Sequence, residues 1–140
     1  MSSSDSGTPP APDPAVVSLP PSAAPSGPTI STHVLDAQTG LPAGGIHVSL
    51  YKLGEDDRPI RLTQALTDGD GRIRDLLERP MSPGVYRLEF NLGGVRGLRP
   101  ADDRFFRRMS LDLKIDDDVT RSYHVPLLLS PFSMTTYRGS

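Results

Sequence analysis

The chain has 140 residues, and its 15 basic and 17 acidic side chains give a formal net charge of −2 at pH 7. This near-neutral balance argues against nucleic-acid binding, which depends on an excess of Lys and Arg. The chain contains no cysteine, so a disulfide framework and a thiolate metal site are both excluded.

The first 28 residues differ in composition from the rest. They hold 8 of the 15 prolines and no Lys or Arg, and most of the other residues are Ser, Ala and Gly. Such a segment has too few large apolar side chains to offset the entropy of ordering. We therefore expect a disordered N-terminal arm over residues 1–28 and one folded domain over residues 29–140, which is long enough to bury its own core.

Neither an export signal nor a membrane span is predicted. The N-terminus lacks a basic region followed by an apolar one, and the chain has no run of 18 apolar residues. We therefore expect a cytoplasmic protein that does not interact with membranes.

Alternation of apolar and polar residues predicts short strands joined by turns rich in Gly, Pro and Asp. In chain order these are residues 30–35, 46–51, 60–66, 73–77, 86–92 and 109–116, a strand that begins at Tyr123, and a short Thr/Tyr strand after Pro131. Residues 67–72 predict a tight loop with two glycines at positive φ, and residues 101–108 predict a short helical turn. About eight strands with closely spaced turns are typical of an antiparallel β-sandwich.

Three polar clusters stand out from this strand pattern. The first contains His33, the second contains Arg72 after a glycine turn, and the third is the C-terminal stretch with His124, Tyr137 and Ser140. Each residue alone has an ordinary structural explanation, because a strand histidine is usually solvent-facing and an arginine after a glycine is usually an exposed loop cation. The clusters become informative only together.

Together, the clusters resemble the signatures of the 5-hydroxyisourate hydrolases of the transthyretin-like family in type, order and approximate spacing. The first signature is similar to His-Val-Leu-Asp at residues 33–36 followed by residues 40–43, the central one to residues 67–72, and the last to residues 123–140, which end in Tyr-Arg-Gly-Ser. One departure is Met134, where family members frequently have an aromatic residue, and we interpret it as a packing substitution. The resemblance implies a transthyretin-like (prealbumin-like) β-sandwich.

The resemblance also implies an activity in urate degradation, a part of purine catabolism. The implied reaction is hydrolysis of a cyclic amide C–N bond that converts 5-hydroxyisourate to 2-oxo-4-hydroxy-4-carboxy-5-ureidoimidazoline, without a cofactor. We assign His33 and His124 to orient and deprotonate the water, with the choice between them open, because histidine titrates near neutral pH. Arg72 is assigned to meet the developing negative charge. His33, Arg72, Tyr137 and Ser140 are the predicted substrate contacts.

A transthyretin-like small-ligand carrier without catalysis is the alternative function. Carriers of this fold keep the Val-Leu-Asp strand and the Leu-Ser-Pro turn but lack the histidines, the loop arginine and the Tyr-Arg-Gly-Ser ending. This chain has His33, Arg72 and His124, which favours the hydrolase.

No metal site is predicted. Asp68 and Asp70 beside glycines suggest a calcium loop, but the EF-hand pattern requires ligands where Arg72 and Arg79 stand. No two of the three histidines have a metal-ligand spacing within one strand or helix. We interpret His47, in the middle of the second strand, as non-catalytic.

The resemblance implies a homotetramer, a dimer of dimers with active sites at the subunit interface. A physical reason is that the predicted strands would hold His33 and His124 on a surface face. A polar face with catalytic groups needs a lid to exclude water, and a symmetric partner supplies one.

Overall fold

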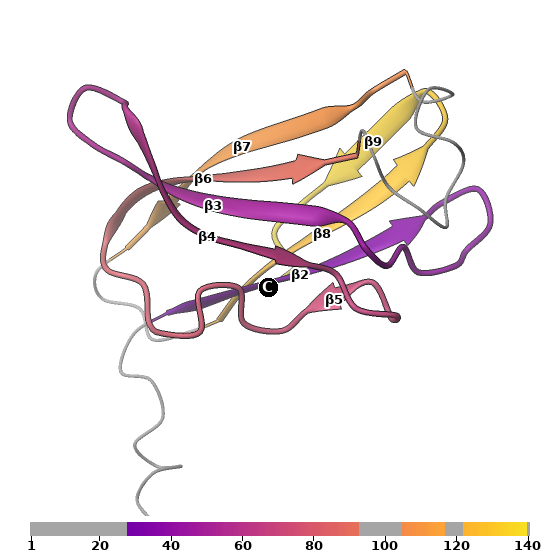
Figure 1. The fold of residues 1–140 in the computed structure, drawn as a ribbon, viewed down its shortest axis with the longest axis horizontal. Coiled ribbons are helices and arrows are strands. Elements are labelled where there is room, and N and C mark those ends of the chain that lie inside the picture. Colours follow the sequence, from indigo (N-terminus) through magenta and orange to yellow (C-terminus); the bar gives the residue numbers. More distant parts are fainter. Residues whose placement is uncertain (1–27, 93–104, 117–121, 140) are drawn as a thin grey trace, which may run out of the picture.

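The computed structural model describes residues 28–92, 105–116 and 122–139. Two four-stranded sheets pack face to face (Figure 1), which confirms the predicted all-β sandwich. The described residues contain no helix. Of the predicted helical turn, residues 101–104 lie outside the described part and residues 105–107 are not helical. The predicted arm also lies outside it, apart from Pro28.

The first sheet has the strand order β5-β2-β8-β9 and the second has the order β4-β3-β6-β7. The strands of the first sheet are β2 (Thr29–Asp36), β5 (Arg72–Ile73), β8 (Ser122–Ser130) and β9 (Ser133–Thr136). The strands of the second sheet are β3 (His47–Leu53), β4 (Pro59–Leu66), β6 (Gly84–Asn91) and β7 (Arg108–Ile115).

The pairing of β2 with β8 is parallel, whereas the other strand pairs of the two described sheets are antiparallel. It extends over eight residue pairs, from Thr29 opposite Ser122 to Asp36 opposite Leu129. The predicted antiparallel sandwich is therefore confirmed apart from this one parallel pairing, which the sequence analysis did not predict. Side-chain alternation is the same in both directions, so the sequence pattern carries no information on strand direction.

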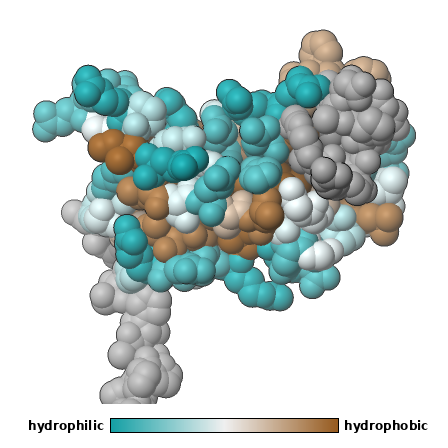
Figure 2. Space-filling model, viewed as in Figure 1, coloured by the Kyte–Doolittle hydropathy of each residue, from teal (hydrophilic) through white to brown (hydrophobic). Residues whose placement is uncertain are grey.

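Apolar side chains from both sheets form one core. The predicted inner face of β6 is confirmed, because Tyr86, Leu88 and Phe90 are almost fully buried, as are Ile30 and Val34 on β2. Figure 2 shows hydrophobic residues across the middle of the view, with hydrophilic residues around them. Burial of each large apolar side chain stabilises the fold by roughly 1.5–3 kcal/mol.

The predicted third strand forms β4, but its alternation is interrupted. The register with β3 shifts between Leu50 and Tyr51, which pair with Thr63 and Arg61, so that Leu62 is an extra residue on β4. A bulge of this kind reverses which side chains face the core. Leu66 lies opposite the exposed His47 of β3 and is itself 54% exposed, and Ile60, near the other end of this edge strand, is 60% exposed.

The predicted strand over residues 73–77 is too long. The structure has only the two-residue β5, Arg72–Ile73, followed by turns and bends. Leu76 and Leu77 are consecutive and both buried, which a strand with alternating faces does not allow. The apolar residues in this segment therefore fill the core from a loop.

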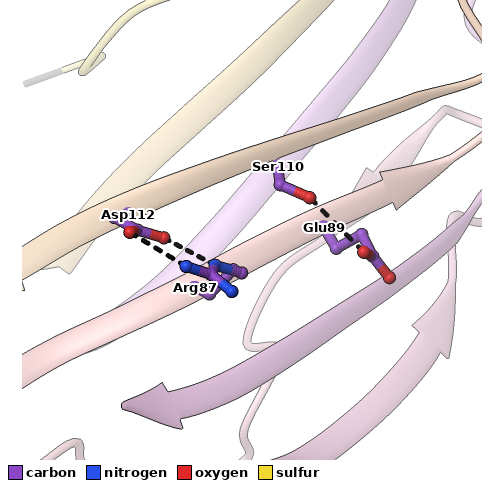
Figure 3. Close-up of polar contacts among 4 residues, drawn as sticks. All are labelled: Arg87, Glu89, Ser110 and Asp112. Atoms are coloured by element: carbon purple, nitrogen blue, oxygen red, sulfur yellow. Dashed lines mark hydrogen bonds and ion pairs between the residues drawn. The ribbon is translucent and has the colours of Figure 1, made fainter. Parts of the chain in front are cut away.

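The outer face of the second sheet carries ordered polar pairs between β6 and β7 (Figure 3). Arg87 donates two hydrogen bonds to Asp112, from Nε to Oδ1 at 2.8 Å and from Nη2 to Oδ2 at 3.2 Å. Ser110 donates one from Oγ to Oε2 of Glu89 at 3.3 Å. Such cross-strand pairs favour the observed register of a half-exposed sheet.

The loop between β4 and β5 approaches β2 closely at Gly71. Its φ is +75°, and its carbonyl oxygen accepts a hydrogen bond from the Val34 amide at 2.7 Å. A Cβ at this position would collide with the Val34 carbonyl oxygen. Of the two glycines predicted to have positive φ, Gly71 does and Gly69 does not.

We predict that Gly71→Ala destabilises the fold more than Gly40→Ala does. Gly40 also has a positive φ, of 79°, but a Cβ there meets nothing within 4 Å. Both variants incur the cost of a left-handed alanine, roughly 1–2 kcal/mol, and only Gly71→Ala adds the steric cost of overpacking, roughly 1–3 kcal/mol. Urea unfolding of the two variants measures the difference, and equal losses would contradict the close approach.

Candidate active site

The three predicted catalytic residues lie on one face of the first sheet. Alternation along β2 buries Thr32 and Val34 and turns the side chain of His33 to the opposite, outer face. In the antiparallel pairing of β2 with β5, His33 is opposite Arg72. In the parallel pairing with β8, Ser31 is opposite His124. Three strands from distant parts of the sequence thus bring two imidazoles and a guanidinium together.

Two neighbouring cavities open on this face. The smaller has a volume of about 170 Å³ and is lined by Ser31, Thr32, Arg72, Ile73, Arg74 and His124. The larger has a volume of about 620 Å³ and is lined by His33, Leu35, Pro42, Asp70, Arg72 and Arg74. Arg72 and Arg74 line both cavities, so the two form one cationic region of the surface. The larger volume is within the usual range for small-molecule sites.

The imidazole of His124 is held from two sides. Its Nδ1 lies 2.8 Å from Oγ of Ser31. On another side the backbone of Gly139 packs against the ring, since a Cβ on Gly139 would lie 2.8 Å from Cδ2 of His124. The Gly139 amide also donates a hydrogen bond to the carbonyl oxygen of His124 at 2.7 Å. The ring is therefore fixed by one hydrogen bond and by backbone packing.

Burial lowers the pKa of His124 below its ordinary value, and electrostatic interactions with His33 and Arg72 lower it further. The first cause is desolvation, which disfavours the charged imidazolium, and the second is repulsion between like charges. His124 is therefore neutral at pH 7 and able to accept a proton.

Arg72 is positioned by a loop closed through Asp68. Oδ1 of Asp68 accepts hydrogen bonds from the backbone amides of Arg72 and Asp70, each at 2.9 Å. The hydrogen bond from the Arg72 amide is the main cause of the lowered pKa of Asp68. This carboxylate thus caps the turn that leads into β5.

Tyr137 does not line either of the two cavities beside Arg72. It is 57% exposed and lines a third cavity of about 350 Å³, together with Arg138, residues 111–115 of β7, and Tyr123 and Val125 of β8. Ser140 lies outside the described residues. Substrate contact by these two residues stays a prediction.

His47 lies on the second sheet, exposed, with Nε2 of Gln64 at 3.4 Å from its Nδ1. The other two histidines, His33 and His124, lie on the first sheet. Within the described ranges, no group of three His, Cys, Asp or Glu residues could hold a metal ion. None of the described residues belongs to a helix long and apolar enough to cross a membrane.

Our sequence interpretation missed three residues of this face, Ser31, Arg74 and Gly139. The pattern did contain a signal for two of them, because Ser31 is two residues from His33 and Arg74 is two residues from Arg72, and such residues share a face of a strand. The contact of Gly139 with the ring of His124 depends on the path of the chain after β9, which no local pattern determines.

Comparison with known proteins identifies the family. The model of the HIUase/Transthyretin family matches residues 30–139. The chain belongs to this family. The resemblance to this family that the sequence motifs indicated is therefore confirmed over residues 30–139.

The similar proteins include both 5-hydroxyisourate hydrolases and transthyretins. A 5-hydroxyisourate hydrolase of Halalkalibacterium halodurans is 38% identical over 116 residues, covering 79% of this chain and 97% of that protein. The solved structure of Klebsiella pneumoniae 5-hydroxyisourate hydrolase is 37% identical, with a TM-score of 0.65, and the match covers 80% and 99% of the two chains. Transthyretin from Sparus aurata is 28% identical, with a TM-score of 0.70, over 79% and 95%.

Backbone similarity and sequence identity rank the hydrolase and the transthyretin structures in opposite order. The backbone superposition is slightly better with the transthyretin, whereas the sequence identity is higher with the hydrolases. We give more weight to identity, because one fold hosts several functions and the chemistry depends on the side chains of the site.

We predict that His124 contributes to the pH dependence of stability. The unfolded chain binds a proton at the ordinary histidine pKa of about 6.5, whereas folded His124 binds it only at lower pH, so the free energy of unfolding falls as the pH drops through this window. His124→Asn removes this contribution and should flatten the decline. Urea unfolding between about pH 7.5 and 5 measures it, with His47→Asn as the comparison for loss of a histidine elsewhere. An unchanged slope in His124→Asn would contradict the lowered pKa.

Proposed function

We propose that this protein hydrolyses 5-hydroxyisourate to 2-oxo-4-hydroxy-4-carboxy-5-ureidoimidazoline in urate degradation. The observation that carries the proposal is the common face of His33, Arg72 and His124, with cavities at both sides of Arg72. The names of the bacterial relatives support the same substrate. The enzyme is thus a hydrolase acting on a cyclic amide C–N bond.

The residues of this face suit each step of the hydrolysis. A neutral imidazole accepts one proton from water as the water oxygen bonds to the ring carbonyl carbon. The guanidinium of Arg72 stabilises the oxyanion of the tetrahedral intermediate with planar paired donors. The C–N bond then breaks, and the imidazolium returns its proton to the leaving nitrogen. Besides water and the substrate, each step uses only side chains of the protein.

A small-ligand carrier is the second candidate, favoured by the similarity to the transthyretin of Sparus aurata. The lining of the two cavities argues against it, since it contains two arginines and two histidines, groups that hydrolysis uses for proton transfer and charge stabilisation and that passive binding does not require. Absorbance decay of freshly generated 5-hydroxyisourate distinguishes the two functions. A hydrolase accelerates the decay over the spontaneous rate, and a carrier leaves it unchanged or slows it.

We propose that the active form is a homotetramer, a dimer of dimers with the active sites at the subunit interface, in the cytoplasm. His33 and His124 are half-buried on the outer face of a sheet, and a symmetric partner would exclude water from this face. Contact of the substrate with Tyr137 and Ser140 is part of this proposal. The support for Tyr137 is that the chain from Tyr137 returns to His124 through Gly139.

We also propose that residues 29–140 form the hydrolase domain and that the arm before it is disordered up to Pro28, which is itself ordered because its carbonyl oxygen accepts a hydrogen bond from the Met81 amide at 2.7 Å. The family match over residues 30–139 supports this boundary, as does the composition of the arm.

We predict that His33→Asn and His124→Asn each lower turnover by at least about a hundredfold, because a proton acceptor typically contributes 10² to 10⁴ in rate. Asparagine retains the approximate size of the side chain, so the fold should persist. His47→Asn is the matched control and should keep the native rate. Absorbance decay, with circular dichroism on the same samples, measures the effect. Near-native turnover in either site variant would remove that histidine from the mechanism.

We predict that Arg72→Lys also lowers turnover substantially, because an ammonium cannot reproduce the planar fork of a guanidinium. The same assay applies, with Arg61→Lys on exposed β4 as the matched control. Full activity of Arg72→Lys would show that a point charge suffices.

A further inference from the structure

The hydrogen bond between Ser31 and His124 determines which ring nitrogen is free for chemistry. Oγ of Ser31 lies 2.8 Å from Nδ1, and Gly139 occupies the side of the ring at Cδ2. Among the described residues, no hydrogen-bond partner is recorded for Nε2. Nδ1 is therefore engaged by the protein, and Nε2 is the nitrogen available to a reacting molecule.

The 2.8 Å contact fits two tautomers of a neutral imidazole. Either the Ser31 hydroxyl donates to Nδ1, which places the proton on Nε2, or Nδ1–H donates to the hydroxyl, which leaves a lone pair on Nε2. The first tautomer makes Nε2 a proton donor and the second makes it a base. The choice decides what His124 can do.

The charges around the ring favour the second tautomer. Arg72 and Arg74 line the cavity that His124 shares with Ser31, and no carboxylate is among its lining residues in the described part of the chain. His33, on β2, adds a further cation when protonated. A positive field in this cavity repels a proton on the nitrogen that faces it and stabilises a lone pair there. The proton is therefore favoured on Nδ1, where the Ser31 hydroxyl oxygen at 2.8 Å can accept its hydrogen bond.

We propose that Ser31 is a positioning residue that accepts a hydrogen bond from Nδ1–H of His124, so that unprotonated Nε2 of His124 is the base that takes the proton from water. The assignment rests on the proposed hydrolase function and adds to it the division of labour between the two histidines. As the water oxygen bonds to the carbonyl carbon, one water proton moves to Nε2. His124 becomes an imidazolium that keeps its Nδ1–H bond to Ser31, and His33 is left to orient the water or substrate.

Nuclear magnetic resonance of ¹⁵N-histidine-labelled native protein tests the tautomer without substrate. We expect a pyrrole-type shift at Nδ1 of His124 and a pyridine-type shift at Nε2 above the pKa of the ring, with the signals assigned by their loss in His124→Asn. A proton on Nε2 in the native protein would overturn the proposal.

Kinetics of Ser31 variants test the positioning. We expect Ser31→Ala to lower kcat by roughly tenfold, the factor that corresponds to one orienting hydrogen bond, with little change in KM. The pH profile of kcat and the tautomer signal should change with it, and Ser31→Thr should restore both, since the hydroxyl is retained. Ser122→Ala is the matched control, because that β8 hydroxyl is bonded to Thr29 and not to a histidine.

The outcomes separate the two proposals. If the native protein does not accelerate decay of 5-hydroxyisourate, the proposed function fails, whatever the tautomer. If the native protein is active but Ser31→Ala keeps the native kcat, pH profile and tautomer, the function stands and the role of Ser31 is wrong.

Discussion

Alternation along β2 is the constraint on which the rest of the structure depends. Ile30 and Val34 point into the core from one side of this strand, while Ser31 and His33 point out from the other. A shift of one residue would bury both polar side chains and expose the apolar ones. Because β2 lies between β5 and β8, its register also decides where Arg72 and His124 meet it. Hydrophobic burial and the geometry of the proposed active site are therefore set by the same strand.

The sequence allowed prediction of whatever depends on local periodicity and on family signatures. The faces of β2 and β6 followed from alternation, and the residues that share the candidate site followed from resemblance. Three features could not be predicted, because each depends on contacts between distant residues: the parallel direction of β8, the bulge at Leu62, and the loop that buries both Leu76 and Leu77. The contact of Ser31 with His124 was missed for the same reason.

The fold alone does not separate a hydrolase from a transthyretin, since solved structures of both superpose on this chain with similar TM-scores. The difference lies in a few side chains on one sheet face. These are held by backbone geometry that would be costly to change: Gly71 has no room for a side chain, and the Asp68 carboxylate closes the turn before Arg72. The scaffold thus places a guanidinium beside two imidazoles with little freedom.

The partners in the proposed site are far apart along the chain, and this has a consequence for folding. Ser31 and His124 are separated by 93 residues, so the entropy of closing a long loop opposes their contact. Proteins dominated by such non-local strand pairings fold slowly. On the ribosome, β2 emerges early and lacks one of its two neighbours until β8 has been synthesised, so that one edge of β2 stays unpaired in the nascent chain.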